Sequence, residues 1–168
     1  MDTLLINIAD VKNLTYMRDN VTIDKYKQYI ISAQNIQLRE IIGKDCLKEL
    51  ADARSANTLD QYQTELLDIV KPFLVNYSYA KYVFSSPLTS TEEGIVKLSG
   101  DNIIHLTESE KKREMQFYES NADSYKAQII ELLESDKDNY TCYHDDNCSC
   151  CKDDELGTSI FNLWYLLQ

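Results

Sequence analysis

The sequence is poor in glycine and proline, with 4 Gly and 2 Pro among 168 residues. A multi-turn β-sandwich or barrel needs these residues at its turns, so an all-β architecture is disfavoured. Hydrophobic residues make up 43% of the chain and charged residues 27%, which is ordinary for a globular domain. The length fits one domain, or one domain with a tail, and the fold class that remains is mainly α.

Long apolar runs and an excess of basic residues are also missing. No run approaches the ~18 apolar residues of a membrane-spanning helix, and Asp2 stands where a signal peptide needs basic residues. The 17 Lys and Arg are outnumbered by 28 Asp and Glu, and a net charge of −11 argues against tight wrapping of nucleic acid. We therefore expect no membrane contact and a chain that stays in the cytoplasm where it is made.

Familiar catalytic signatures are absent as well. The chain contains no G-x-S-x-G elbow, P-loop, H-E-x-x-H motif or dinucleotide glycine fingerprint. His105 falls in a predicted strand, where a surface or cross-strand role is simpler than general base catalysis. The carboxylates fall on predicted helix faces or in an acidic tail, where solvation explains them. We therefore expect a protein that is not an enzyme.

The five cysteines are unevenly placed, because four lie within ten residues and Cys46 stands alone. A secreted disulfide framework would spread its cysteines through the fold, so a reduced intracellular chain is the simpler interpretation. Together with a histidine, the cluster has the ligand types of a tetrahedral zinc site. Its members are Cys142, His144, Cys148, Cys150 and Cys151. Because their spacing departs from paired C-x₂-C elements, we expect free thiols and no cofactor, with zinc as the alternative.

The hydrophobic pattern divides the chain into three parts. Residues 1–21 lack a sustained period and predict an extended N-terminal arm, whereas residues 22–135 predict a helical domain. Residues 136–168 form an acidic, cysteine-rich tail with an apolar terminus at 160–167. Between Glu134 and Glu155 this region holds eight acids and two lysines, which is over half of the net charge.

Within the helical domain the pattern predicts a bundle that ends in a long helix. The expected helices are 22–43, 45–56, 59–84 and 107–135, with a β-hairpin at 95–106. Thr58 with Gln61, and Thr107 with Glu110, have the spacing of capping boxes. Pro72 predicts a kink or a break in its helix.

Two surfaces are candidates for contact between subunits. Residues 73–84 are apolar on almost every side, so this helix is either the centre of the core or covered by a neighbouring subunit. The apolar terminus also needs a docking place. The candidate interface residues are Tyr77, Tyr79, Tyr82, Phe84, Phe161, Trp164 and Tyr165.

The long helix carries a heptad-like seam, with apolar or small residues spaced three and four apart. Its members are Met115, Tyr118, Ala122, Tyr125, Ile129 and Leu132. Packing inside the bundle is the simpler interpretation, and a coiled seam between subunits is the alternative.

The order of these parts resembles a known family. The arm leads into TIDKYKQYIISAQNIQLREIIGKDCL (22–47), a Tyr-rich helix (66–84), the link TSTEEGIVKL (89–98) and a long charged helix. Over residues 10–135 this order is similar to the head–tail connector (adaptor) proteins of tailed bacteriophages, in the form carried by crAss-like phages and related elements of Bacteroidetes. The cysteine-rich tail lies outside the resemblance.

The resemblance implies a structural virion protein at the head–tail junction, present in the host cytoplasm before assembly. Such adaptors form a ring of about twelve copies under the portal, against neighbouring neck or tail rings, and genomic DNA passes through the lumen. A negative charge agrees with a lumen that repels DNA. The alternatives are another neck or tail-completion ring protein, or a small cytosolic Cys/His metal-binding regulator.

Overall fold

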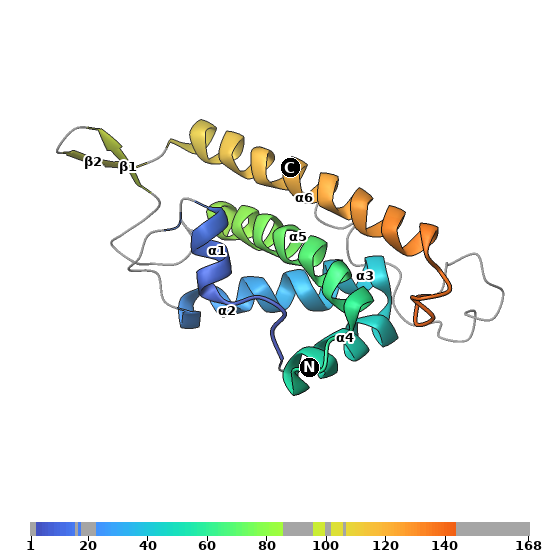
Figure 1. The fold of residues 1–168 in the computed structure, drawn as a ribbon. Coiled ribbons are helices and arrows are strands. Elements are labelled where there is room, and N and C mark those ends of the chain that lie inside the picture. Colours follow the sequence, from blue (N-terminus) through green and yellow to red (C-terminus); the bar gives the residue numbers. More distant parts are fainter. Residues whose placement is uncertain are drawn as a thin grey trace, which may run out of the picture.

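The computed structural model describes residues 3–15, 17, 23–85, 96–99, 102–105 and 107–143. These ranges contain six α-helices, one π-helical segment and two short strands (Figure 1). In chain order they are α1 (Ile8–Leu14), α2 (Ile23–Ser32), η1 (Ala33–Leu38), α3 (Arg39–Ile42), α4 (Lys44–Ala56), α5 (Gln61–Ser85), β1 (Val96–Ser99), β2 (Asn102–His105) and α6 (Glu108–Ser135). The predicted mainly helical fold with a long late helix is confirmed. No helix within the described ranges is both long and apolar enough to cross a membrane.

Helices α5 and α6 form an antiparallel pair that runs the length of the molecule (Figure 1). At one end the Tyr79 and Tyr118 rings meet with their centroids 4.6 Å apart. At the other end the hydroxyl of Tyr140, just beyond α6, donates to the backbone oxygen of Tyr62 at 3.0 Å. Tyr118, Ala122 and Ile129 of the predicted seam are buried, so the seam packs inside the chain.

Helix α5 is the centre of the core, because α1, α2, η1 and α6 all pack against it. Of the two alternatives for residues 73–84, the centre of the core and a surface covered by a neighbouring subunit, the structure agrees with the first. Of the kink or break expected at Pro72, the break is wrong, since α5 continues through it from Gln61 to Ser85. One turn later, Asn76 Nδ2 donates to the Pro72 carbonyl at 2.7 Å. Packing on several sides holds the helix together where Pro72 removes one backbone donor.

The extended N-terminal arm is also wrong for the residues that the structure describes. Asn7 caps α1 through a capping box with Asp10, and Leu5, Ile6 and Val11 are at most 1% exposed. A helix of seven residues is too short to produce a clear hydrophobic period. Packing against α5 stabilises it instead.

The expected helix 22–43 is present, but its centre is π-helical. It ends at Gly43 as predicted, and the φ of +82° there suits glycine. Gln34, in the π-helical segment η1, is fully buried. Its Oε1 accepts from the Leu5 N–H at 2.8 Å, and its Nε2 donates to the Thr3 carbonyl at 2.9 Å. One buried amide thus fastens the N-terminal segment to the helical body.

Of the two capping boxes predicted at helix starts, one is present and the other is replaced by a different pair of residues. The capping box of Thr107 and Glu110 is confirmed at α6. The box expected at Thr58 is wrong, because Asp60 and Gln63 exchange these hydrogen bonds instead, at 2.7 and 3.2 Å. An acid at the N-cap competes well with threonine for this position.

The two strands pair antiparallel, with Val96 opposite His105 and Ser99 opposite Asn102. They lie within the segment 95–106. In Figure 1 this pair of strands stands apart from the helices, beyond the end of the molecule where α5 ends and α6 begins. We call this the hairpin end.

Candidate interaction surface and disulfide

The structure separates the predicted interface residues of α5. Tyr79 is only 5% exposed and packs against Tyr118, so it belongs to the core and is unavailable to a partner. Tyr77 and Tyr82 are half-buried against the same core. Phe84 alone among the four is well exposed, at 62%. The other candidates, Phe161, Trp164 and Tyr165, lie outside the described residues.

The core tyrosines belong to a continuous series of ring contacts across three helices. The rings are those of Tyr29, Tyr26, Tyr82, Tyr79, Tyr118 and Phe117, with neighbouring centroids 4.6 to 6.1 Å apart. The hydroxyl oxygens of Tyr26 and Ser78 lie 2.8 Å apart, within hydrogen-bonding distance. The Ser85 hydroxyl donates to Tyr29 Oη at 2.7 Å. These contacts hold α2 and α6 on α5 near the hairpin end.

Burial keeps several of these phenols neutral. It raises the pKa of Tyr26, Tyr79 and Tyr82 above the ordinary value. Burial, with nearby Glu65 and Asp136 adding to it, raises the pKa of Tyr140 to about 12. These tyrosines therefore stay protonated to a higher pH in the folded chain than in the unfolded chain.

We expect the fold to lose stability in alkali because of these tyrosines. In the unfolded chain these tyrosines ionise near pH 10. Their contribution to the free energy of unfolding is therefore complete below about pH 10 and is lost as the pH rises toward 12. A tyrosinate absorbance titration with parallel circular dichroism should show late ionisation accompanied by loss of helix. Ionisation of all 12 tyrosines near pH 10 with the helix signal intact would contradict this prediction.

Two exposed aromatic rings lie in the half of the α5–α6 pair that is nearer to the strands. Phe84 is the penultimate residue of α5, and Phe117 is the tenth residue of α6, more than two turns from its start. They are 62% and 56% exposed. Phe117 also touches Tyr118, with centroids 5.2 Å apart, so its ring is attached to the rigid core series. We call these two rings the exposed aromatic pair, and the sequence identified only Phe84 of the two as a contact candidate.

A charged contact braces the same end of the helix pair. Lys81 Nζ lies 3.1 Å from Glu119 Oε1 and 5.0 Å from the centroid of the Tyr77 ring. Burial lowers the pKa of Lys81, but Tyr77 and Glu119 outweigh it and raise that pKa above the ordinary value. The ammonium group therefore stays charged and helps to hold α6 on α5.

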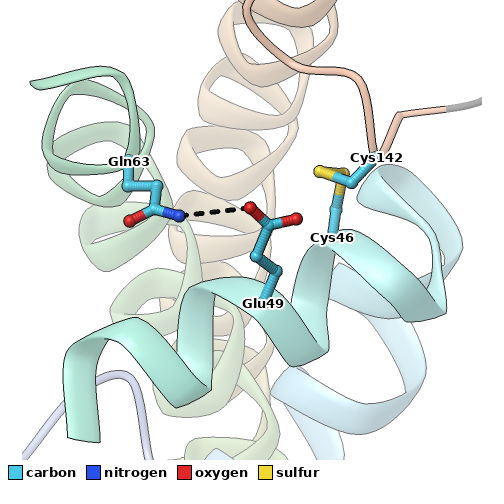
Figure 2. Close-up of a disulfide and its surroundings, with 4 residues drawn as sticks. All are labelled: Cys46, Glu49, Gln63 and Cys142. Atoms are coloured by element: carbon cyan, nitrogen blue, oxygen red, sulfur yellow. Dashed lines mark hydrogen bonds between the residues drawn. A yellow bond between two sulfur atoms is a disulfide. The ribbon is translucent and has the colours of Figure 1, made fainter. Parts of the chain in front are cut away.

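A disulfide joins Cys46 of α4 to Cys142, just after α6 (Figure 2). The two Cα atoms are 4.9 Å apart, although 96 positions separate the residues in the sequence. The expectation of reduced cysteines is therefore wrong for this pair, and Cys142 is neither the free thiol that we expected nor available as a zinc ligand, the alternative. Sequence spacing gave no signal, because residues 96 positions apart meet only when α4 and the turn after α6 are in their folded positions.

The described residues contain no group of three or more histidines, cysteines and acids that could hold a metal ion. With Cys142 in a disulfide, the candidate zinc ligand set loses one of its five members. His144, Cys148, Cys150 and Cys151 lie outside the residues that the structure describes.

A shallow, open hollow follows the outer side of α4 near the disulfide. It is lined by Asp45, Lys48, Glu49, Asp52, Ala53, Ala56 and Thr58. Figure 2 shows Glu49 reaching toward Gln63, whose Nε2 donates to Glu49 Oε1 at 3.4 Å. Three acids and one lysine give this hollow a polar, mainly negative lining without a histidine or cysteine that could act as a base or nucleophile.

These features define a mainly helical protein with a tyrosine-rich core, a separate pair of strands and one long-range disulfide. The chain belongs to DUF6712, a family of unknown function, whose model matches residues 38–153. That range contains both disulfide cysteines, the α5–α6 pair and the strands between them. No curated protein and no solved structure matches the chain.

Proposed function

We propose that this protein is a structural component of a tailed-phage virion that forms a ring at the portal vertex, joins head to tail and lets DNA pass through its lumen. The observation that carries the proposal is the hairpin end. There a pair of strands stands clear of the helical body (Figure 1). Phe84, near the end of α5, and Phe117, in the first half of α6, are well exposed.

The hairpin end needs a partner on physical grounds. A two-stranded sheet is marginally stable by itself and is usually packed against something else. Rings as exposed as Phe84 and Phe117 are typical anchors of protein–protein contacts when the residues beneath them are rigid. A contact between this end of one copy and a different surface of the next is heterologous, and it gives a closed ring when the rotation closes.

The proposed partners are other copies of the chain, in a ring of about twelve, the portal protein and neighbouring neck or tail rings. The net charge of −11 would keep DNA from adhering to the lumen. Another neck or tail-completion ring protein fits the same features. The Cys/His regulator has less support, because Cys142 is joined to Cys46.

Negative-stain microscopy tests the ring directly. We expect rings from the purified protein, alone or after mixing with the portal protein of the same genome. Replacing residues 97–104 with a Gly-Ser linker should abolish the rings and leave the helical signal in circular dichroism, because the strands lie outside the helical body. Only monomers under both conditions would contradict the proposal.

The exposed aromatic pair provides a finer test. We expect the double variant Phe84→Ser and Phe117→Ser to weaken self-association by at least about tenfold, since anchor residues typically contribute 2 kcal/mol or more. Its unfolding free energy should change little, as both rings are exposed. Analytical ultracentrifugation and urea unfolding measure the two effects. The matched control is Ile31→Ser, another exposed hydrophobic residue, on α2, and equal weakening by both variants would argue against a specific contact at this end.

A further inference from the structure

The two sulfur atoms of the disulfide have unlike surroundings. Cys46 is only 1% exposed, whereas Cys142 is partly exposed in the turn that follows α6. Thiol–disulfide exchange proceeds by attack of a thiolate on one sulfur and departure of the other. We infer that Cys142 is a thiol–disulfide exchange site, with Cys46 as the buried leaving group.

The position of Cys46 favours its departure as a thiolate. It is the third residue of α4, whose 13 residues begin at Lys44. The N-cap is Gly43, and no side chain caps this helix. The N–H groups of the first turn and the positive end of the helix dipole therefore stabilise negative charge on the Cys46 sulfur. A stabilised leaving thiolate speeds exchange.

The burial of Cys46 opposes this effect, because burial disfavours a thiolate, and two acids on α4 oppose it as well. Asp45 and Glu49 are both exposed, so water and salt screen their charges. Glu49 also accepts the hydrogen bond from Gln63 (Figure 2). The greater exposure of Cys142 therefore remains the main ground for attack at that residue.

Opening of the disulfide should stay local. Tyr140 is 4% exposed and its hydroxyl donates to the Tyr62 carbonyl, so the turn before Cys142 is attached to α5 independently of the disulfide. Exchange would therefore detach the chain from α4 at Cys142 and leave the helical body folded. This inference does not depend on ring formation.

The attacking thiolate can come from the chain or from solution. Cys148, Cys150 and Cys151 follow Cys142 by six to nine residues, and a short link of this kind gives an effective concentration of about the millimolar range. A small thiol such as glutathione offers the same chemistry. In either case the Cys46–Cys142 bond breaks, the attacking sulfur bonds to Cys142, and the electron pair leaves on Cys46, which then takes a proton from water. No external oxidant is needed.

Mass mapping of disulfides in the full-length protein tests the site. The oxidised protein is incubated without oxygen at about pH 8, quenched with acid, labelled with a maleimide and digested, with and without reduced glutathione. We expect Cys142 to acquire the new partner and Cys46 to acquire the label, exceeding the reverse arrangement by at least about tenfold.

The source of the thiolate is distinguished by the triple variant Cys148→Ser, Cys150→Ser, Cys151→Ser. If the chain supplies it, the parent protein exchanges without added thiol and the variant does not. If a small thiol supplies it, both exchange only with glutathione, which is then found on Cys142. New partners on Cys46 as often as on Cys142 would overturn the inference. So would an unchanged disulfide in both arms while a urea-unfolded sample redistributes its disulfides.

Discussion

Replacing Cys142 with serine is expected to lower the free energy of unfolding by roughly 4 kcal/mol, within the usual range of 2–5 for a native disulfide. The bond joins residues 96 positions apart and so closes a long loop in the unfolded chain. Without it the unfolded state gains the conformational freedom of that loop. Urea unfolding followed by circular dichroism measures the difference.

The matched control for this prediction is Cys148→Ser, which removes a neighbouring cysteine outside the disulfide. Its unfolding curve should match that of the parent chain. Treatment of the parent with a strong reductant should reproduce the curve of Cys142→Ser. If Cys142→Ser unfolds at the same urea concentration as the oxidised parent, the disulfide contributes nothing to stability and the prediction is wrong.

Replacing Gln34 with leucine is expected to cost about 3 kcal/mol. The new side chain has a similar volume but makes neither hydrogen bond. Because Gln34 is fully buried, the Leu5 N–H and the Thr3 carbonyl then have no hydrogen-bond partner in its place. Each buried polar group left unsatisfied costs about 1–3 kcal/mol. Thermal or urea unfolding gives the total loss.

The loss should concentrate on the N-terminal segment. Limited proteolysis of the Gln34→Leu variant should cut before α2 earlier than it cuts the parent, because the amide no longer holds the segment on η1. The matched control, Gln37→Leu, alters a half-buried glutamine of the same π-helical segment. Equal sensitivity of the two variants would show that the hydrogen bonds of Gln34 have no special role.

Elements with a sustained period could be predicted from the sequence. The seam from Met115 to Leu132 indicated α6, and the dense apolar stretch 73–84 indicated a helix at the centre of the core. The starts and ends that rest on local chemistry, such as Thr107 and Gly43, were equally visible. All of these depend on neighbours within a few positions along the chain.

The missed features depend on residues far apart in the sequence. Helix α1 is stabilised by contacts with α5, and the role of Gln34 arises only when Thr3 and Leu5 arrive beside it. The disulfide needs α4 and the end of α6 in their final places. Among the interface residues, Tyr79 looked like its neighbours in the sequence, and only the position of Tyr118 shows that it is buried.

The disulfide also determines which residues can extend when the two ends of the chain are pulled apart. Residues 46–142 lie inside a covalent loop, while α1, α2, η1 and α3 lie outside it and are held by packing and hydrogen bonds. A force applied to the two ends can straighten less than half of the oxidised chain's residues. At about 3.4 Å per extended residue, reduction would lengthen the stretched chain by roughly 300 Å. A single-molecule pulling trace would therefore report the oxidation state of Cys46 and Cys142 as a length.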